Sequence, residues 1–417
     1  MTRHPKLALG LIFALALLAR FALIAMLYTP DLTRFQSGDW ELYRIGGEYI
    51  RAEGDFSNSL FLLRPPLFPV LIALLDGDGQ AVLYTNVIIG AAMAPLAVLF
   101  ARQVKLSMGA ALAVGVIVAL DPANIAYSAW LGAEPLANTM FMIMLVALLH
   151  AVVYADGWRA LAWAALAGVA LSMSVWSRPA AYLIWTGLSV WLVLVYRRKW
   201  MVIAVYALVS VIGIGAWVVH NGRVFDNYTV SSVGAYSMLY YRAASVEHWG
   251  SGDDMDAVYL RLAARVEEKM GRDPSKVNDL TRHTHYAGSS ELTDAMMETA
   301  LETFKKYPAA YVFTIPIGLG RMYGFSSQIP NWMRPLEVLW NLVFVAGTAV
   351  GLGYAFRRRE CLLLWITVLV CGYYTVGTLV AQTSGMDARM RTMLAPLMAA
   401  ALVYGVIAFR TQRQGAV

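Results

Sequence analysis

Long apolar runs separated by short polar segments dominate the sequence. A helix needs roughly 20 apolar residues to cross the hydrocarbon core of a bilayer. Runs close to that length occupy residues 7–28, 81–103, 106–121, 134–153, 160–177, 180–196, 201–220, 335–356, 361–380 and 392–409. The pattern predicts an all-α polytopic membrane protein with about ten transmembrane helices.

Composition agrees with this pattern. The 417 residues are 59% hydrophobic and 14% charged, whereas soluble domains carry about 25% charged residues. A chain this apolar cannot present a soluble surface, which excludes a soluble globular protein. The first run follows a basic N-terminus. It is too long for a signal-peptide core and has no small-residue cleavage site, so we expect it to remain as a membrane helix.

Basic residues indicate the orientation of the helices. With ten spans, the loops that carry most Lys and Arg fall on one side together with both termini, which is the positive-inside pattern. We therefore expect both termini in the cytoplasm. These basic residues are Arg3, Lys6, Arg102, Lys105, Arg159, Arg197, Arg198, Lys199, Arg357, Arg358, Arg359, Arg410 and Arg413.

This topology leaves two large segments on the outer side, residues 29–80 and 221–308. The second contains at least two amphipathic helical patterns, so we expect a small outer helical domain there. It would separate an N-terminal transmembrane module, residues 1–220, from a C-terminal part, residues 309–417.

Two apolar stretches are unsuited to a full crossing. Residues 67–75 are too few, and residues 309–327 are interrupted by Pro316, Gly318 and Arg321. We expect both stretches to lie at the interface or to enter the membrane only partly.

The first outer segment carries an acid in an unusual position. If residues 40–52 form a helix, Asp39 lies on the stripe that faces protein or membrane, with Tyr43, Gly46 and Ile50. A carboxylate on that face needs a partner or a chemical task. Two interpretations stay open: Ser37 or Asp39 caps the helix, or Asp39 takes part in catalysis. The opposite, solvated stripe consists of Glu41, Arg44, Glu48 and Arg51.

Three arginines on the outer side are candidates for binding an anion. Arg64 precedes two prolines, which hold the backbone extended, and its guanidinium suits a phosphate; contact with lipid headgroups is the alternative. Arg389 and Arg391 precede the last span, on the side where the positive-inside bias disfavours arginine. That position makes ligand binding a candidate role for either one, with no ligand role as the equally open alternative.

Further outer residues allow more than one role. Glu134 begins the fourth predicted span, where the helix dipole also favours an acid. Arg178 precedes Pro179, which favours anchoring of the loop, and Arg242 is a weaker candidate for ligand binding. His283 and His285 lack the further ligands of a metal site. The only cysteines, Cys361 and Cys371, share one apolar run, so no disulfide framework is predicted.

The order of these elements resembles the GT-C superfamily of polytopic glycosyltransferases. The nearest types are bacterial enzymes similar to dolichyl-phosphate-mannose-protein mannosyltransferases, including the lipid A aminoarabinose transferases. The resemblance extends over nearly the whole chain. Its motifs, in order, are Asp39 with Tyr43 and Gly47, Arg64-Pro65-Pro66-Leu67, Tyr127-Ser128 through Glu134-Pro135, Ser177-Arg178-Pro179, Trp217 to Tyr236, Ala300 to Tyr311, and Arg389-Met390-Arg391 with Pro396.

The resemblance implies a GT-C fold and an inverting transfer of a sugar from polyprenyl phosphate to an acceptor hydroxyl. The site would lie on the periplasmic side of a bacterial inner membrane. Asp39 would be the general base and Arg64 would hold the donor phosphate. Arg389 or Arg391 would stabilise the leaving phosphate. Further candidates for substrate contact are Tyr43, Glu41, Glu134, Arg178 and Arg242.

The acceptor is expected to be a glycan, a lipid or a protein, and no nucleic acid is expected. No cofactor is predicted; a divalent metal would require Asp39, Glu41 and Glu134 to come together. Two other functions stay open. A ligase with a polyprenyl-pyrophosphate donor would need more arginines, and a transporter would need ionisable groups inside its spans, for which Arg20 is the main candidate.

Overall fold

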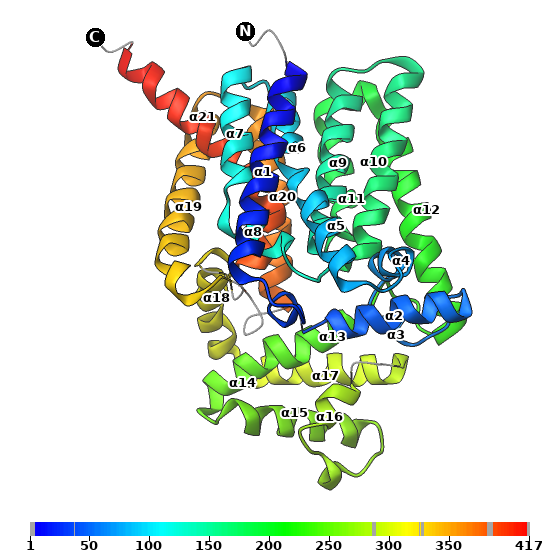
Figure 1. Ribbon diagram of the computed structural model, residues 1–417. Helices are drawn as coiled ribbons and strands as arrows, with labels where there is room; N and C mark the ends of the chain where they lie inside the picture. Colours follow the sequence, from blue (N-terminus) through cyan, green and yellow to red (C-terminus); the bar gives the residue numbers. More distant parts are fainter. Residues whose placement is uncertain are drawn as a thin grey trace.

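The computed structural model describes residues 5–36, 38–285, 289–324, 326, 329–381 and 387–414, and it contains no β-strand over these residues. Long helices form an upright bundle, and shorter helices lie across one of its ends (Figure 1). The all-helical architecture predicted from the sequence is confirmed.

The described part of the chain contains eight helical segments long and apolar enough to span a bilayer, or nine if one bent pair counts as a single span. The bent pair, α7 and α8, changes direction by 55°. The bundle helices are α1 (Pro5–Leu27), α5 (Gly79–Ala91), α6 (Met93–Gln103), α7 (Met108–Ala119), α8 (Pro122–Ser128), α9 (Glu134–Val153), α10 (Gly157–Ser177), α11 (Ile184–Tyr196), α12 (Trp200–Phe225), α19 (Arg334–Arg357), α20 (Cys361–Ala381) and α21 (Ala395–Gln414).

One of these segments, Pro179–Phe225, is 47 residues long, about twice the length that one crossing needs. At its start, Arg178 pairs with Glu134 at the beginning of α9. At its middle, Lys199 donates to Asp156 at the opposite end of α9, over 2.5 Å. The chain therefore turns back between α11 and α12. The eight or nine candidate spans of the described residues compare with about ten predicted from the sequence.

The bundle has two different ends. Figure 1 places both termini at one end, which we call the basic end because the loop of Arg197, Arg198 and Lys199 lies there. The opposite end, the site end, carries the short helices. These are α2 (Trp40–Glu53), α3 (Leu60–Leu63), α4 (Leu67–Leu74), α13 (Val233–Ser237), α14 (Ala244–Ser251), α15 (Met255–Lys269), α16 (Thr281–Thr284), α17 (Ser290–Lys306) and α18 (Pro308–Gly324).

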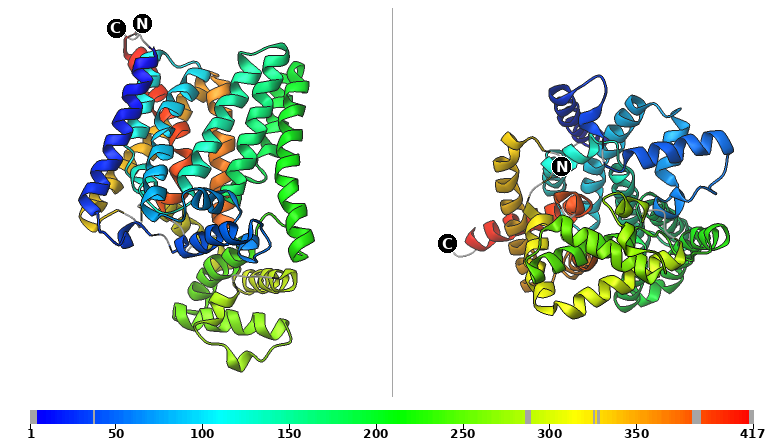
Figure 2. Two further views of the ribbon diagram at one scale, coloured as in Figure 1. Left: turned by 45° about the vertical axis from the view of Figure 1, so that its right-hand side comes forward. Right: turned by 90° about the horizontal axis from the view of Figure 1, so that it is seen from below.

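Helices α13 to α17 form a compact unit, the site-end domain, below the bundle (Figure 2). Its core is apolar and includes Leu239, Val258, Leu262 and Met296, each fully buried. Some charged side chains of this domain pair with one another; the buried Glu247 accepts from Arg261 over 2.6 Å and also pairs with Arg265. The unit occupies the region in which an outer domain was expected, residues 221–308.

Helix α18 contains the doubtful apolar stretch. Its 17 residues include Pro316, and it is not among the segments that meet the length and composition of a span. It lies at the site end beside α14 and α19 (Figure 1). This position agrees with the expectation that the stretch does not cross; residues 325, 327 and 328 lie outside the described part.

Candidate functional site

Packing of α2 against α4 fixes the first polar residues of the site. Gly46 and Gly47 face α4, and a methyl group on Gly47 would lie 2.7 Å from Cγ2 of Ile72. Only glycine therefore permits this close approach. Tyr43, one turn earlier, packs edge-on against Phe68 with ring centroids 5.0 Å apart. The predicted inward stripe is confirmed at Tyr43 and Gly46, which are buried.

Asp39 stands at the N-cap position of α2, but its side chain makes no capping hydrogen bond. Its carboxylate accepts instead from the guanidinium of Arg64. The capping role considered for the Asp39 side chain is therefore wrong; Ser37, the other candidate cap, lies outside the described residues.

Arg64 takes the extended conformation expected before Pro65, with φ −116° and ψ 108°. This backbone aims the side chain back at α2, where its guanidinium carbon lies 5.6 Å from the ring centre of Tyr43. Only 13% of the Arg64 side chain is exposed. The stiff segment thus holds a cation beside Asp39.

A second set of charged residues lies near Asp39 and Arg64. Glu134, at the start of α9, is buried and pairs with Arg178 at the end of α10. The same carboxylate oxygen lies 3.6 Å from Nη1 of Arg389, in the 3₁₀ turn Ala388–Leu394. Glu134 therefore positions two arginines that come from distant parts of the sequence.

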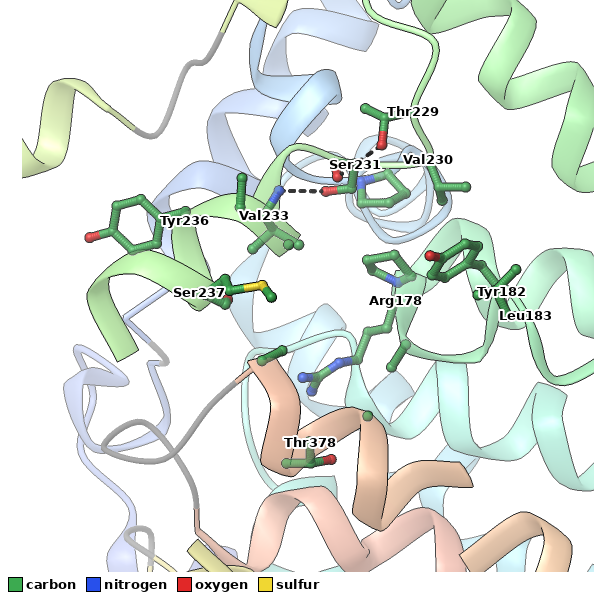
Figure 3. A pocket seen from close by; sticks show the side chains of 18 of the residues that line it. Arg178, Tyr182, Leu183, Thr229, Val230, Ser231, Val233, Tyr236, Ser237 and Thr378 are labelled. Atoms are coloured by element: carbon green, nitrogen blue, oxygen red, sulfur yellow. Dashed lines mark hydrogen bonds between the residues drawn. The ribbon is translucent and has the colours of Figure 1, made fainter. Parts of the chain in front are cut away.

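These groups border a cavity of about 960 Å³ between the bundle and the site-end domain. Asp39, Arg64, Arg178 and Arg389 are its charged lining residues. Apolar side chains of α11, α12 and α20 form one wall, including Trp185, Ile214, Val218 and Val380. Figure 3 shows the Arg178 side chain reaching into the space between the 229–237 segment and Thr378.

The arginines control the ionisation of Asp39. Burial raises the pKa of this carboxyl, but the positive charges of Arg64, Arg389 and Arg178 outweigh burial, so its pKa lies below the ordinary value of 3.8. Asp39 is therefore a carboxylate at neutral pH. Burial raises the pKa of Tyr43 to about 12, so this phenol stays protonated and serves as a hydrogen-bond donor.

Three predicted site residues lie elsewhere. Arg391 is fully buried and binds Asp121, so it does not line the cavity and its predicted role at the phosphate has no support. Arg242 is also fully buried; it donates to the Thr314 hydroxyl over 2.7 Å and stacks on Tyr311. These contacts make it a link between the site-end domain and α18.

Glu41 faces solvent on α2, where it pairs with Arg44. Its side chain is 61% exposed, so Glu41 does not join Asp39 and Glu134. Among the described residues, no group of three His, Cys, Asp or Glu side chains lies close enough to hold a metal ion.

Sequence reasoning missed one wall of the cavity. Residues 228–241 and part of α17 line it with hydroxyl and aromatic side chains. The Ser- and Tyr-rich composition of this stretch was a signal, but it follows no spacing that separates a ligand wall from a surface loop. Arg178 was also undervalued, because an Arg-Pro pair favours loop anchoring.

Comparison with known proteins identifies the fold. No protein-family model and no curated protein sequence matches the chain. The crystal structure of the oligosaccharyltransferase of Archaeoglobus fulgidus in the apo form aligns with all of this chain and 52% of its own, at 14% identity and TM-score 0.56. The archaeal oligosaccharyltransferase AglB of the same organism, in complex with an inhibitory peptide and a dolichol-phosphate, aligns over the same shares at 12% identity and TM-score 0.54.

A structure of ArnT from Cupriavidus metallidurans bound to undecaprenyl phosphate overlaps more weakly, with TM-score 0.42 at 12% identity over 96% of this chain and 78% of its own. The chain spans about half the length of the archaeal oligosaccharyltransferases that it matches. Since those alignments cover the whole of this chain and include the site-end helices, the chain shares the fold of the corresponding half of these archaeal oligosaccharyltransferases.

Proposed function

We propose that the chain is an inverting glycosyltransferase that moves a sugar from a polyprenyl-phosphate donor to an acceptor hydroxyl at the outer face of the membrane. One observation carries the proposal: a carboxylate and three arginines border a large cavity whose bundle wall is apolar. A lipid-linked phosphate has the same division, with an apolar tail and an anionic head.

The cavity offers each part of such a donor a matching surface. The apolar side chains of α11, α12 and α20 would bind the polyprenyl tail, because burial of apolar surface is favourable. The guanidinium groups of Arg64, Arg178 and Arg389 would bind the phosphate. Asp39 would then lie beside the sugar carbon that carries the phosphate.

Charge favours a monophosphate over a pyrophosphate donor. Arg64, Arg178 and Arg389 face three carboxylates, those of Asp39, Glu134 and Asp387, which leaves no excess of positive charge in the group. A sugar attached to polyprenyl phosphate adds one negative charge to it. A pyrophosphate donor adds two, and a ligase of that kind would need a further cation.

The proposed reaction is one displacement. The acceptor oxygen forms a bond to the anomeric carbon, the acceptor proton passes to Asp39, and the bond from that carbon to the phosphate oxygen breaks. The departing polyprenyl phosphate gains a second negative charge, which the arginines stabilise. Attack from the face opposite the phosphate inverts the anomeric configuration.

Binding of the donor would also change the partner of Asp39. In the structure Arg64 holds this carboxylate, and such a paired carboxylate is a weak base. A phosphate that draws Arg64 away would raise the pKa of Asp39 and prepare it to accept the proton. The orientation proposed is that predicted from the basic loops, with both termini cytoplasmic and the site end on the periplasmic side.

The first test replaces Asp39 with asparagine. Transfer of radiolabelled sugar from polyprenyl phosphate into the envelope fraction should fall by about 10²–10⁴-fold, the usual contribution of a general base. The variant should keep its expression level and thermal midpoint, because Asn can still accept from Arg64. Transfer at the wild-type rate would end the general-base proposal.

A further inference from the structure

The site-end domain presents an uncharged, hydroxyl-rich wall to the cavity. The side chains that line it include Tyr228, Thr229, Ser231, Ser237, Tyr241 and Thr293. Figure 3 shows Thr229, Ser231 and Ser237 along the strip of chain that faces Arg178 across the cavity. This wall lies outside the bundle, whereas the arginines lie at the bundle's end.

The wall lacks charge although the domain that forms it is rich in charged residues. Residues 221–308 contain 13 acidic and 10 basic residues, yet none of those that the structure describes lines the cavity. The undescribed internal residues, 37, 286–288, 325, 327–328 and 382–386, include no Asp, Glu, Lys or Arg; the side chain of His283 also lies outside the described part. The charges of the domain are used elsewhere, as in the pair of Glu267 with His285 at 2.7 Å.

Two wall hydroxyls, those of Ser231 and Thr293, are arranged to accept hydrogen bonds. Ser231 donates to the Leu63 carbonyl over 2.6 Å, and Thr293 donates to the Ser289 carbonyl over 3.0 Å. Each also accepts one bond, from the Val233 amide at 3.2 Å and from the Asn227 amide group at 3.4 Å. A hydroxyl has one proton and two lone pairs, so each keeps a lone pair for a donor such as a sugar hydroxyl.

We propose that the group transferred is an uncharged sugar and that this wall binds it; the inference rests on the proposed function. The phosphate of the donor already adds one negative charge to a group whose three arginines face three carboxylates. A carboxylate on the sugar would add a second anion without a cation, and an ammonium group would face three arginines and a wall without an acid. A buried charge that lacks a partner is costly, whereas neutral hydroxyls find partners on the wall.

The first experiment compares ligands on the purified protein, with thermal stabilisation as the readout of binding. The four ligands are polyprenyl phosphate alone and the same lipid carrying a neutral pentose, a 4-amino pentose or a uronic acid. We expect the neutral glycolipid to bind at least about tenfold more tightly than either charged one, in line with the penalty for an unpaired buried group.

The outcomes separate the two proposals. Tighter binding of a charged glycolipid than of the neutral one would overturn the assignment of an uncharged sugar and leave the glycosyltransferase proposal standing. If no polyprenyl phosphate stabilises the protein, the proposed donor, and with it the proposed function, is wrong.

A substitution in the wall gives an independent test. Thr293→Asp places a carboxylate in the first turn of α17, where the helix dipole favours acids, and Thr293→Asn is its uncharged match. We expect the aspartate variant to shift the binding preference toward the 4-amino pentose by about tenfold relative to the asparagine variant, as a charge-assisted hydrogen bond would. Equal preferences in the two variants would show that Thr293 does not face the sugar, and would overturn the assigned wall.

Discussion

Arg389 and Arg391 stand two residues apart in the same 3₁₀ turn, yet they belong to different environments. Arg389 lines the cavity, with 22% of its side chain exposed and Glu134 at 3.6 Å. Arg391 has no exposed surface; its guanidinium donates to both oxygens of Asp121, over 3.0 and 3.3 Å, and also to Asn341. One ion pair is open to a ligand and the other is sealed.

The difference shows how the fold divides two tasks among similar residues. A sealed pair with no exposed surface cannot be reached by a phosphate, but losing one partner would leave a charge in an apolar interior. Asp121 also caps α8, accepting from the Asn124 amide over 3.1 Å, so the sealed pair joins the 3₁₀ turn to the bend between α7 and α8. The open pair can exchange its carboxylate for a ligand.

Breaking the sealed pair should have the largest effect on folding. Asp121→Asn retains a side-chain oxygen for the cap but removes the carboxylate that pairs directly with Arg391. We expect a loss of about 3–5 kcal/mol in the free energy of unfolding, seen as a lower thermal midpoint and a lower yield from membranes.

The matched control is Asp156→Asn, which removes a carboxylate that pairs with Lys199 but is 91% exposed. Its thermal midpoint should stay at the wild-type value, because exposed pairs contribute little. A stable Asp121→Asn protein would show that the sealed pair does not hold the turn.

Breaking the pair of Arg389 with Glu134 should affect catalysis and not folding. Arg389→Gln removes one of the charges that would stabilise the leaving phosphate, so we expect kcat/KM for the polyprenyl-phosphate donor to fall by about 10²–10³-fold. The thermal midpoint should change little, since the side chain is partly exposed. Arg223→Gln, at an exposed arginine of α12 outside the cavity lining, is the control and should keep full activity.

The sequence could predict the bundle but not which arginine opens to the cavity. Each span is a local run of apolar residues, so periodicity and length suffice to find it. Arg389 and Arg391 lie in a 3₁₀ turn, with three residues per turn, and side chains two positions apart there point in different directions. Charge counting placed both on the outer side without showing which one Asp121 would bind.

The charged group of the cavity was predictable only in part. Asp39 and Arg64 share one outer segment, and helical phasing separated Asp39 from the solvated stripe. Arg178 joins them only because Glu134 holds it across the end of α9, a contact between residues 44 positions apart. No spacing rule reports such a contact, so the Arg-Pro motif alone favoured a loop anchor.

A smaller effect is expected when Arg64 is replaced, on the pH dependence of kcat/KM. Since the pKa of Asp39 is held down by Arg64, Arg389 and Arg178, the wild-type carboxylate is ionised throughout the neutral range. Arg64→Gln removes one of these charges while burial continues to raise the pKa, so the pKa increases. The acidic limb of kcat/KM against pH should therefore move to higher pH in the variant, and a limb at the wild-type position would argue against Asp39 as the titrating base.

The smallest effect is expected for the pair of Glu41 with Arg44, which faces solvent and not the cavity. Glu41 lies two residues from Asp39, but it pairs with Arg44 on the solvent side of α2, where its side chain is 61% exposed. Exposed pairs at helical spacing contribute about 0.3–0.5 kcal/mol, so Glu41→Gln should leave both the thermal midpoint and sugar transfer near their wild-type values. Because Glu41 is the neighbouring acid on the same helix, its substitution is the matched control for Asp39→Asn. A large loss of transfer in Glu41→Gln with an unchanged thermal midpoint would show that Glu41 and not Asp39 is the base. It would also mean that α2 rotates when the substrate binds.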